Sequence, residues 1–186
     1  QLDIVTIEIE NVNVNALKRL EKQGVKVFPQ PHIIELIQDK GLQKQFFIDH
    51  SIPTAPFVFI DAKNQLNDFS SMFPSVMKSR KAGYDGRGVY NVNAEADIIH
   101  AFDVPSILEK RVEFIKELSV LVARNERGEI KTFDVVEMEF NSAANLVEYL
   151  IAPARISEKI ENEARELAIT IIEELKMVGL LAVELF

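Results

Sequence analysis

The chain has 186 residues, of which 47% are hydrophobic and 27% are charged, a balance typical of a folded globular protein. Its net charge of −8 argues against a nucleic-acid polymer or an anionic membrane as a partner, so a phosphate ligand needs a local group of cations. The absence of cysteine excludes disulfides, thiolate nucleophiles and cysteine-bound metals. Apolar runs are too short for a membrane span and no signal peptide is apparent, so we expect a cytoplasmic protein.

The beginning of the chain predicts the last part of an α/β unit. Residues 4–9 alternate apolar and polar side chains, as in a half-buried strand. Asn13 suits the N-cap of a helix that Gly24 would end, and residues 25–28 read as a second strand. Because the pattern at 4–9 starts so near the first residue, and an apolar strand pattern at 180–186 reaches the last one, we expect a fragment.

A longer helix is predicted to start at Pro31 and to reach about residue 49. Gly41 weakens its middle, so a break there is left open. Its expected buried side chains are Ile33, Leu36, Ile37, Phe46 and Phe47.

The rest of the chain reads as short strands followed by one amphipathic helix. The strand candidates are residues 57–60, 75–78, 88–91, 106–109, 114–124, 129–137 and 180–186, with residues 125–128 as a hairpin turn. Ser157 is expected to cap the helix and Gly179 to end it. Its apolar face should comprise Ile160, Ala164, Leu167, Ala168, Ile171 and Leu175. Strands grouped apart from helices predict an α+β fold.

The segment 78–88 gathers glycines and cations between two predicted strands. Glycines let backbone N–H groups approach an anion, and the surrounding cations, which are Lys78, Arg80, Lys81 and Arg87, would neutralise it. The alternative is a hairpin with a favoured Asp85-Gly86 turn and solvated charges. The pattern alone leaves both readings open.

Three carboxylates in strand-like segments are further candidates. Glu184 is the only charged residue within 180–186, and a buried carboxylate there would need a cation such as Mg²⁺, whereas a solvent-facing one would not. Glu109 and Glu117 would share one face of a continuous strand and could bind sugar hydroxyls, or they could be surface charges.

Several segments match, in order, motifs of one family. Thr6 to Val12 fits T-x-E-x-E-N-V, Gln38 to Lys44 fits Q-D-R-x-x-x-K, and Lys78 with Gly83 to Gly88 fits K-x-x-x-x-G-Y-D-G-R-G. Glu109, residues 117–120, residues 152–154 and residues 178–186 follow in register. The chain therefore resembles, over nearly its whole length, the carboxyaminoimidazole ribonucleotide synthase branch of the ATP-grasp ligases.

The resemblance implies a partial ATP-grasp fold preceded by the tail of an α/β pre-ATP-grasp domain. Residues 1–30 would be that tail, residues 31–110 the N-terminal ATP-grasp subdomain with its glycine-rich loop, and residues 111–186 the first part of the C-terminal subdomain. The residues implied to bind ATP are Lys40, Lys78, Gly83, Tyr84, Asp85, Gly86, Arg87, Gly88, Val89, Glu109, Lys110, Arg111, Val112 and Glu117.

Within that set the resemblance implies separate roles. Lys78 would hold phosphates, Gly83 to Val89 would close over them, backbone groups of Lys110 and Val112 would read adenine, and Glu117 would accept the ribose hydroxyls. Tyr84, Asp85 and Arg87 would also act in catalysis and face the aminoimidazole ribonucleotide. Glu10 and Asn13 would touch that substrate, and Glu184 would be a Mg²⁺ ligand.

Two positions depart from the family pattern. Lys40 stands where arginine is common, which keeps the charge but loses bidentate phosphate geometry. Phe140 stands where many members have a histidine near the nucleotide, so a hydrogen bond from an imidazole is not expected at this position.

The implied reaction is ATP-dependent carboxylation of aminoimidazole ribonucleotide by bicarbonate through carboxyphosphate, with ATP and Mg²⁺ as cofactors. The fragment alone is expected to have little or no turnover. Two alternatives stay open, namely another ATP-grasp carboxylate–amine ligase and a non-catalytic module that binds nucleotide or dimerises. A homodimer is also left open.

Overall fold

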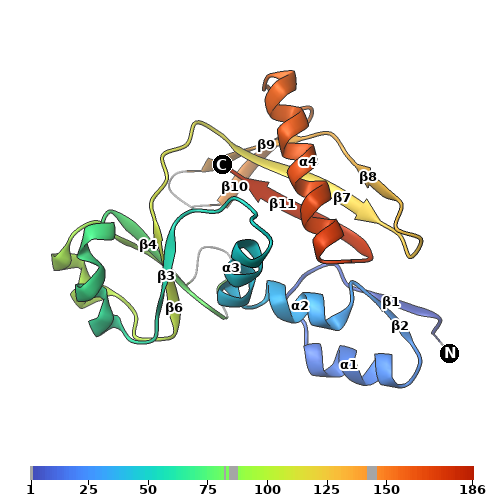
Figure 1. Cartoon of the computed structure of the whole chain (residues 1–186), viewed down its shortest axis with the longest axis horizontal. Helices are drawn as coiled ribbons and strands as arrows, with labels where there is room; N and C mark the ends of the chain where they lie inside the picture. Colours follow the sequence, from blue (N-terminus) through green and yellow to red (C-terminus); the bar gives the residue numbers. More distant parts are fainter. Residues whose placement is uncertain (1, 82, 84–87, 142–145) are drawn as a thin grey trace. The chain divides into compact units, whose positions relative to one another are not determined.

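The computed structural model describes residues 2–81, 83, 88–141 and 146–186, and the chain folds as two compact units (Figure 1). The first unit comprises residues 1–35 and 114–186, and the second comprises residues 36–113. No helix among the described residues is both long and apolar enough to cross a membrane.

The first unit begins with a small parallel sheet. Strands β1 (Ile4–Thr6) and β2 (Lys26–Phe28) pair in parallel, and helix α1 (Val14–Lys22) connects them. The Asn13 Oδ1 atom accepts a hydrogen bond of 3.0 Å from the backbone N–H of Ala16, and Gly24 follows the helix at φ +86°. The predicted strand–helix–strand order is confirmed, although β1 stops at Thr6. Helix α2 (Pro31–Ile37) starts at the expected proline.

A five-stranded antiparallel sheet forms the rest of this unit. Strands β10 (Leu146–Ile151), β9 (Val136–Asn141), β7 (Glu117–Arg124) and β11 (Gly179–Leu185) lie in that order, and β8 (Ile130–Thr132) pairs with β7. Helix α4 (Glu158–Glu174) packs across β7 (Figure 1). The buried side chains of β7, α4 and β11 are Leu118, Val120, Val122, Ala164, Ala168, Ile171, Ile172 and Val183.

Two of the elements predicted here end earlier or are divided in the structure. The strand predicted over 129–137 is divided into β8 and β9 because the Arg165 guanidinium of α4 binds the Phe133 carbonyl at 2.6 Å and the Asp134 carboxylate at 3.1 Å. Helix α4 does not run to Gly179. Lys176 takes the left-handed conformation (φ +49°) after the helix, and Gly179 is the first residue of β11.

Other differences in this unit concern where elements lie. Strand β7 starts at Glu117 rather than at 114, and strand β10 was not predicted at all. Ile160 is exposed, so the apolar face of α4 begins one turn later than expected.

The second unit is built on a four-stranded antiparallel sheet with the order β3-β6-β4-β5. Its strands are β3 (Phe57–Ile60), β6 (Ser106–Lys110), β4 (Ser75–Ser79) and β5 (Val89–Val92), close to the predicted bounds. Helix α3 (Lys40–Asp49) precedes β3, while the 3₁₀ segments η1 (Lys63–Met72) and η2 (Glu95–His100) cover an apolar core. That core contains Ile60, Leu66, Met77, Val92, Ile98, Ala101 and Leu108.

The helix predicted from Pro31 breaks at Gln38–Asp39, ahead of Gly41. Asp39 caps α3, since its Oδ1 atom accepts hydrogen bonds from the backbone N–H groups of Gly41 (2.9 Å) and Leu42 (3.3 Å). Of the five side chains expected to be buried in this region, Ile33 and Phe46 are buried and the other three are half-buried. The predicted α+β class is confirmed.

Candidate functional site

A buried cluster of one carboxylate and two lysines lies on the sheet of the second unit. Glu109 of β6 forms ion pairs with Lys44 of α3 through Oε1 and with Lys78 of β4 through Oε2. The strand register explains the second pair, because Val76 is opposite Glu109 and Lys78 is two residues further along β4 on the same face. Glu109 is only 4% exposed, so the sheet presents this carboxylate to cations and not to solvent.

The cluster keeps Glu109 ionised. Burial by itself raises the pKa of this carboxyl, but the charge of Lys78 and the hydrogen bonds from Lys44 and Lys78 outweigh burial and lower the pKa below its ordinary value. Two ammonium groups around one carboxylate leave an excess of one positive charge. A chain with a net charge of −8 has therefore placed unbalanced positive charge at a specific point, as binding of an anion requires.

A second buried ion pair joins Asp39 to Arg80 at the base of the glycine-rich segment. The guanidinium is bidentate, with Nε 2.9 Å from Oδ1 and Nη2 2.9 Å from Oδ2. A Cβ atom at Gly41 would lie 2.5 Å from the Arg80 Nε atom, so glycine makes room for this guanidinium. Arg80 is thus occupied by Asp39, and Lys81 is exposed and 3.7 Å from the same carboxylate.

The hairpin expected between the two strands is present. Strands β4 and β5 pair with Lys78 opposite Val89, and the Ser79 N–H donates to the Gly88 carbonyl at 2.8 Å. Gly88 has φ +72°, and a Cβ atom there would lie 2.2 Å from the Ser79 Oγ atom. Any other residue here would strain the backbone and would have to displace the Ser79 hydroxyl. Gly83 is half-buried, whereas Tyr84, Asp85, Gly86 and Arg87 lie outside the described residues, so their roles stay predictions.

The predicted adenine hinge follows the end of β6. The Lys110 N–H donates to the Pro56 carbonyl at 2.8 Å and the Arg111 N–H to the Pro74 carbonyl at 3.1 Å, so neither N–H is a donor for a base. Val112 is 37% exposed. Lys40 is the first residue of α3 and its N–H donates to the Arg80 carbonyl at 2.9 Å.

The expectation that Glu109 and Glu117 share one continuous strand is wrong. Glu109 belongs to β6 and Glu117 to β7, in different sheets and different units. The residues between the strands, 111–116, do not form a strand, so the even spacing carries no meaning for the direction of the two side chains.

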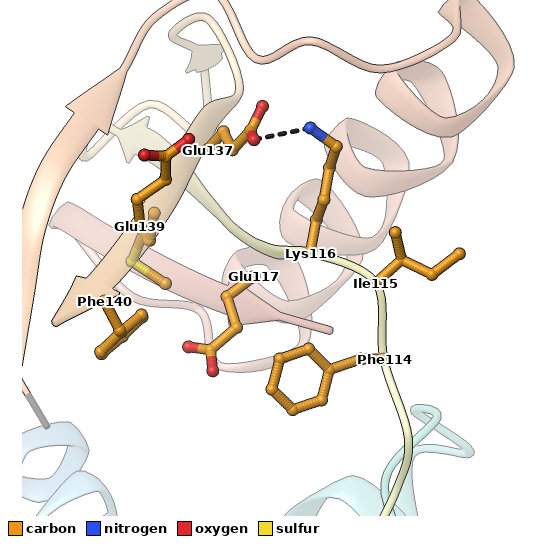
Figure 2. A pocket seen from close by; sticks show the side chains of 8 residues that line it. Phe114, Ile115, Lys116, Glu117, Glu137, Glu139 and Phe140 are labelled. Carbon is orange, nitrogen blue, oxygen red and sulfur yellow. Dashed lines mark hydrogen bonds and ion pairs between the residues drawn. The ribbon is translucent and has the colours of Figure 1, made fainter. Parts of the chain in front are cut away.

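Glu117 lines an open pocket of about 410 Å³ within the first unit (Figure 2). Figure 2 shows the Glu117 side chain and the Phe114 ring at one end of the pocket and the ion pair between Lys116 and Glu137 at the other. The remaining walls are formed by Ile115, Met138, Glu139 and Phe140. A carboxylate beside apolar and aromatic surface suits a ligand with hydroxyl groups and a flat ring.

The Glu137 carboxylate fixes one wall of this pocket. It is 4% exposed and binds the Lys116 ammonium at 2.6 Å and the Arg155 guanidinium at 2.7 Å. Hydrogen bonds from Arg155 and Lys116 lower the pKa of Glu137 to about 2. Arg155 also binds Glu139. These four charges tie β9 to the segments that precede β7 and follow β10.

Glu184 is exposed on β11. It lies opposite Ser119, which puts it on the same face of the sheet as Glu117. Among the described residues no three acidic or histidine side chains converge as a metal site. Two carboxylates on one sheet face supply oxygen ligands of the kind that Mg²⁺ takes, and the metal role stays a prediction.

The two residues expected to touch the substrate lie just before α1. Asn13 uses its side-chain oxygen to cap that helix, and Glu10 is exposed with its carbonyl accepting from the Val12 N–H at 2.8 Å. Both stay predictions.

Comparison with known proteins decides the family. The model of the ATP-grasp domain matches residues 45–186, and that of the ribonucleotide synthetase preATP-grasp domain matches residues 1–38. The chain belongs to the ATP-grasp family.

Individual relatives show which enzymes within the ATP-grasp family this chain is similar to. The N5-carboxyaminoimidazole ribonucleotide synthase of Bacillus subtilis is 35% identical over 99% of the chain and 49% of the relative. The Thermotoga maritima synthetase structure is 38% identical with a TM-score of 0.84, over 99% of this chain and 47% of that one. The Aspergillus clavatus N5-carboxyaminoimidazole synthase, solved with ADP and 5-aminoimidazole ribonucleotide, is 29% identical with a TM-score of 0.86. The match covers 99% of this chain and 49% of that one. The chain therefore spans about half the length of these relatives.

Sequence reasoning missed the ion pairs that organise the site. Asp39 and Lys44 belong to the Q-D-R-x-x-x-K motif, but the motif does not indicate their partners, and no sequence pattern marks Arg155. One signal for Lys44 was available in the sequence. A lysine that lies among the apolar residues of a predicted helix needs a partner if its ammonium is buried.

Proposed function

We propose that this ATP-grasp chain is the nucleotide-binding part of an enzyme that carboxylates 5-aminoimidazole ribonucleotide. Bicarbonate and ATP would yield 5-carboxyaminoimidazole ribonucleotide, ADP and phosphate, as a step of purine biosynthesis. The observation that carries the proposal is the excess positive charge where Lys44 and Lys78 share the buried Glu109 carboxylate. The relatives named for this reaction, one of them bound to ADP and the ribonucleotide, support the choice of substrate.

The residues would act by positioning and charge. Lys78 would neutralise phosphate oxygens, and the loop from Gly83 to Val89 would keep water away from carboxyphosphate. The Lys110 carbonyl and the Val112 N–H would read the adenine edge. Glu117 would accept the ribose hydroxyls at its end of the pocket, where Phe114 offers apolar surface.

Phosphoryl transfer to bicarbonate needs neutralisation of charge more than a protein nucleophile. The γ-phosphoryl group would pass to a bicarbonate oxygen with ADP as the leaving group, and the exocyclic amine of the ribonucleotide would then take the carboxyl group and release phosphate. Mg²⁺ supplies positive charge to the phosphates when bound, and Glu184 would be one of its oxygen ligands.

Phe140 gives the pocket an apolar contact at the position where the family resemblance implies a histidine. Its ring is 41% exposed on the pocket and offers no hydrogen bond. A nucleotide would therefore meet van der Waals surface at this point, and Lys40 would offer a single ammonium in place of a forked guanidinium. We place the protein in the cytoplasm, with a homodimer as one assembly to be tested.

The test is ADP release by a protein that joins this chain to the remaining half found in its relatives. With bicarbonate and Mg-ATP present, addition of 5-aminoimidazole ribonucleotide should stimulate ADP release. Stimulation by a different amine would favour another ATP-grasp ligase, and nucleotide binding without stimulated release would favour a binding module. The 186 residues alone should bind nucleotide with little turnover. Robust turnover would contradict the expectation that this chain needs the remaining half for activity.

A further inference from the structure

The two lysines bound to Glu109 have unequal surroundings. Lys44 is 8% exposed, its ammonium also donates to the Thr54 hydroxyl, and it lies 5.7 Å from the centre of the Phe57 ring. The Lys78 side chain is 28% exposed, and among the described residues its ammonium forms an ion pair with Glu109. Lys44 thus has three neighbours that hold it, whereas within the described part of the chain Lys78 has Glu109 and access to solvent.

The two ammonium groups do not compete for the same atom. Lys44 occupies Oε1 and Lys78 occupies Oε2, and a carboxylate has enough lone pairs to accept both. If Lys78 leaves, Glu109 keeps a full counter-charge in Lys44, so no unpaired buried carboxylate is left behind. If Lys44 were missing, the departure of Lys78 would leave Glu109 buried and unpaired, which is strongly unfavourable.

We propose that Lys44 is a positioning residue that serves as the resident counter-ion of Glu109, so that Lys78 can exchange this carboxylate for a nucleotide phosphate. The inference rests on the proposed function, because it assumes that Lys78 meets a phosphate. It adds an exchange of partners on ligand binding and a role for a residue that does not touch the ligand. Lys44 itself stays on Glu109 throughout.

The test measures dissociation constants of Mg-ATP and of adenosine by competition with a fluorescent ATP analogue, using the whole 186-residue chain. Lys44→Met should weaken Mg-ATP binding by about tenfold or more, since one charge-assisted hydrogen bond must now be broken without compensation. Adenosine, which has no phosphate, should bind within about twofold of the wild type. Lys22→Met, at an exposed lysine of α1, is the control and should change neither.

A conservative variant separates the exchange from simple damage to the fold. Lys44→Arg keeps a positive counter-charge for Glu109, so Mg-ATP affinity should stay within about threefold of the wild type. If Lys44→Met does not fold, as judged by circular dichroism, Lys44→Gln takes its place and should weaken Mg-ATP binding about tenfold while adenosine binding stays within about twofold.

Several results would overturn the inference. They are unchanged Mg-ATP affinity in Lys44→Met, equal loss for adenosine and ATP, and a loss in Lys44→Arg as large as the loss in Lys44→Met. Lys78→Met shows which claim has failed. If Lys78→Met loses ATP binding while Lys44→Met keeps it, the exchange is wrong and the proposed function stands. If the wild type binds no nucleotide, or Lys78→Met binds as well as the wild type, both fail.

Discussion

The substitution Arg80→Met should destabilise the second unit by about 2 kcal/mol. Most of that loss should come from the ion pair between the Arg80 guanidinium and Asp39. Asp39 is 3% exposed, and two nitrogen–oxygen contacts of 2.9 Å join it to Arg80. Breaking a buried pair by removing one partner costs about 3–5 kcal/mol, and we take a lower value because the Arg80 side chain is 32% exposed and screened by solvent.

Matched variants separate the part of this free-energy loss that comes from the ion pair from the part that comes from the N-cap of α3. Burial raises the pKa of Asp39, but the hydrogen bonds from Arg80 and from the Leu42 and Gly41 N–H groups lower it, so the residue is an anion at neutral pH. Asp39→Asn should keep the cap of α3 and lose only the charge, at a cost of about 2 kcal/mol. The double variant that combines Arg80→Met with Asp39→Asn should lose clearly less unfolding free energy than the sum of the two single losses. Both substitutions remove the same ion pair.

Urea denaturation followed by far-UV circular dichroism measures these free energies. Arg127→Met, which removes an exposed arginine of the β7–β8 turn, is the control and should stay within about 0.5 kcal/mol of the wild type. Additive losses in the double variant, or an Arg80→Met loss no larger than that of the control, would refute the assignment of this pair as the tie between α3 and the base of the hairpin.

Two further predictions concern single positions. Gly88→Ala should lower the melting temperature more than Gly128→Ala. Both glycines have positive φ, but a Cβ atom at Gly88 would lie 2.2 Å from the Ser79 hydroxyl oxygen, whereas the nearest atom to a Cβ at Gly128 is 3.6 Å away. Equal losses in the two variants would contradict the close approach at Gly88. Glu137 has a folded pKa of about 2, below its ordinary 4.5, so its contribution to stability is complete above about pH 4.5 and is lost as the pH falls toward 2. Glu137→Gln should therefore show a smaller loss of unfolding free energy over that range in acid titrations, and an unchanged loss would argue against the ion pairs.

Elements governed by local rules were predictable from the sequence. The cap at Asn13, the proline start of α2, the turn at 125–128 and strand β3 all depend on residues within a few positions of one another. The glycine-rich hairpin also belongs here, since its strands pair as the spacing suggested.

What could not be predicted depends on partners far apart in the chain. Arg80 sets the helix break at Asp39 from 41 positions away, and Arg165 divides the strand predicted over 129–137 from about 30 positions away. Local patterns contain no information on such pairs. For the same reason the sequence could point to Lys78 and Glu109 separately but not to the carboxylate that Lys78 shares with Lys44.

Nucleotide binding by this chain is measured most directly by titrating Mg-ATP into the wild type, Lys78→Ala and Glu117→Ala in a calorimeter. Saturable binding that weakens in both variants, with Lys22→Ala unchanged, is the result that the proposed roles of Lys78 and Glu117 predict. Binding of equal strength in all four proteins would contradict it.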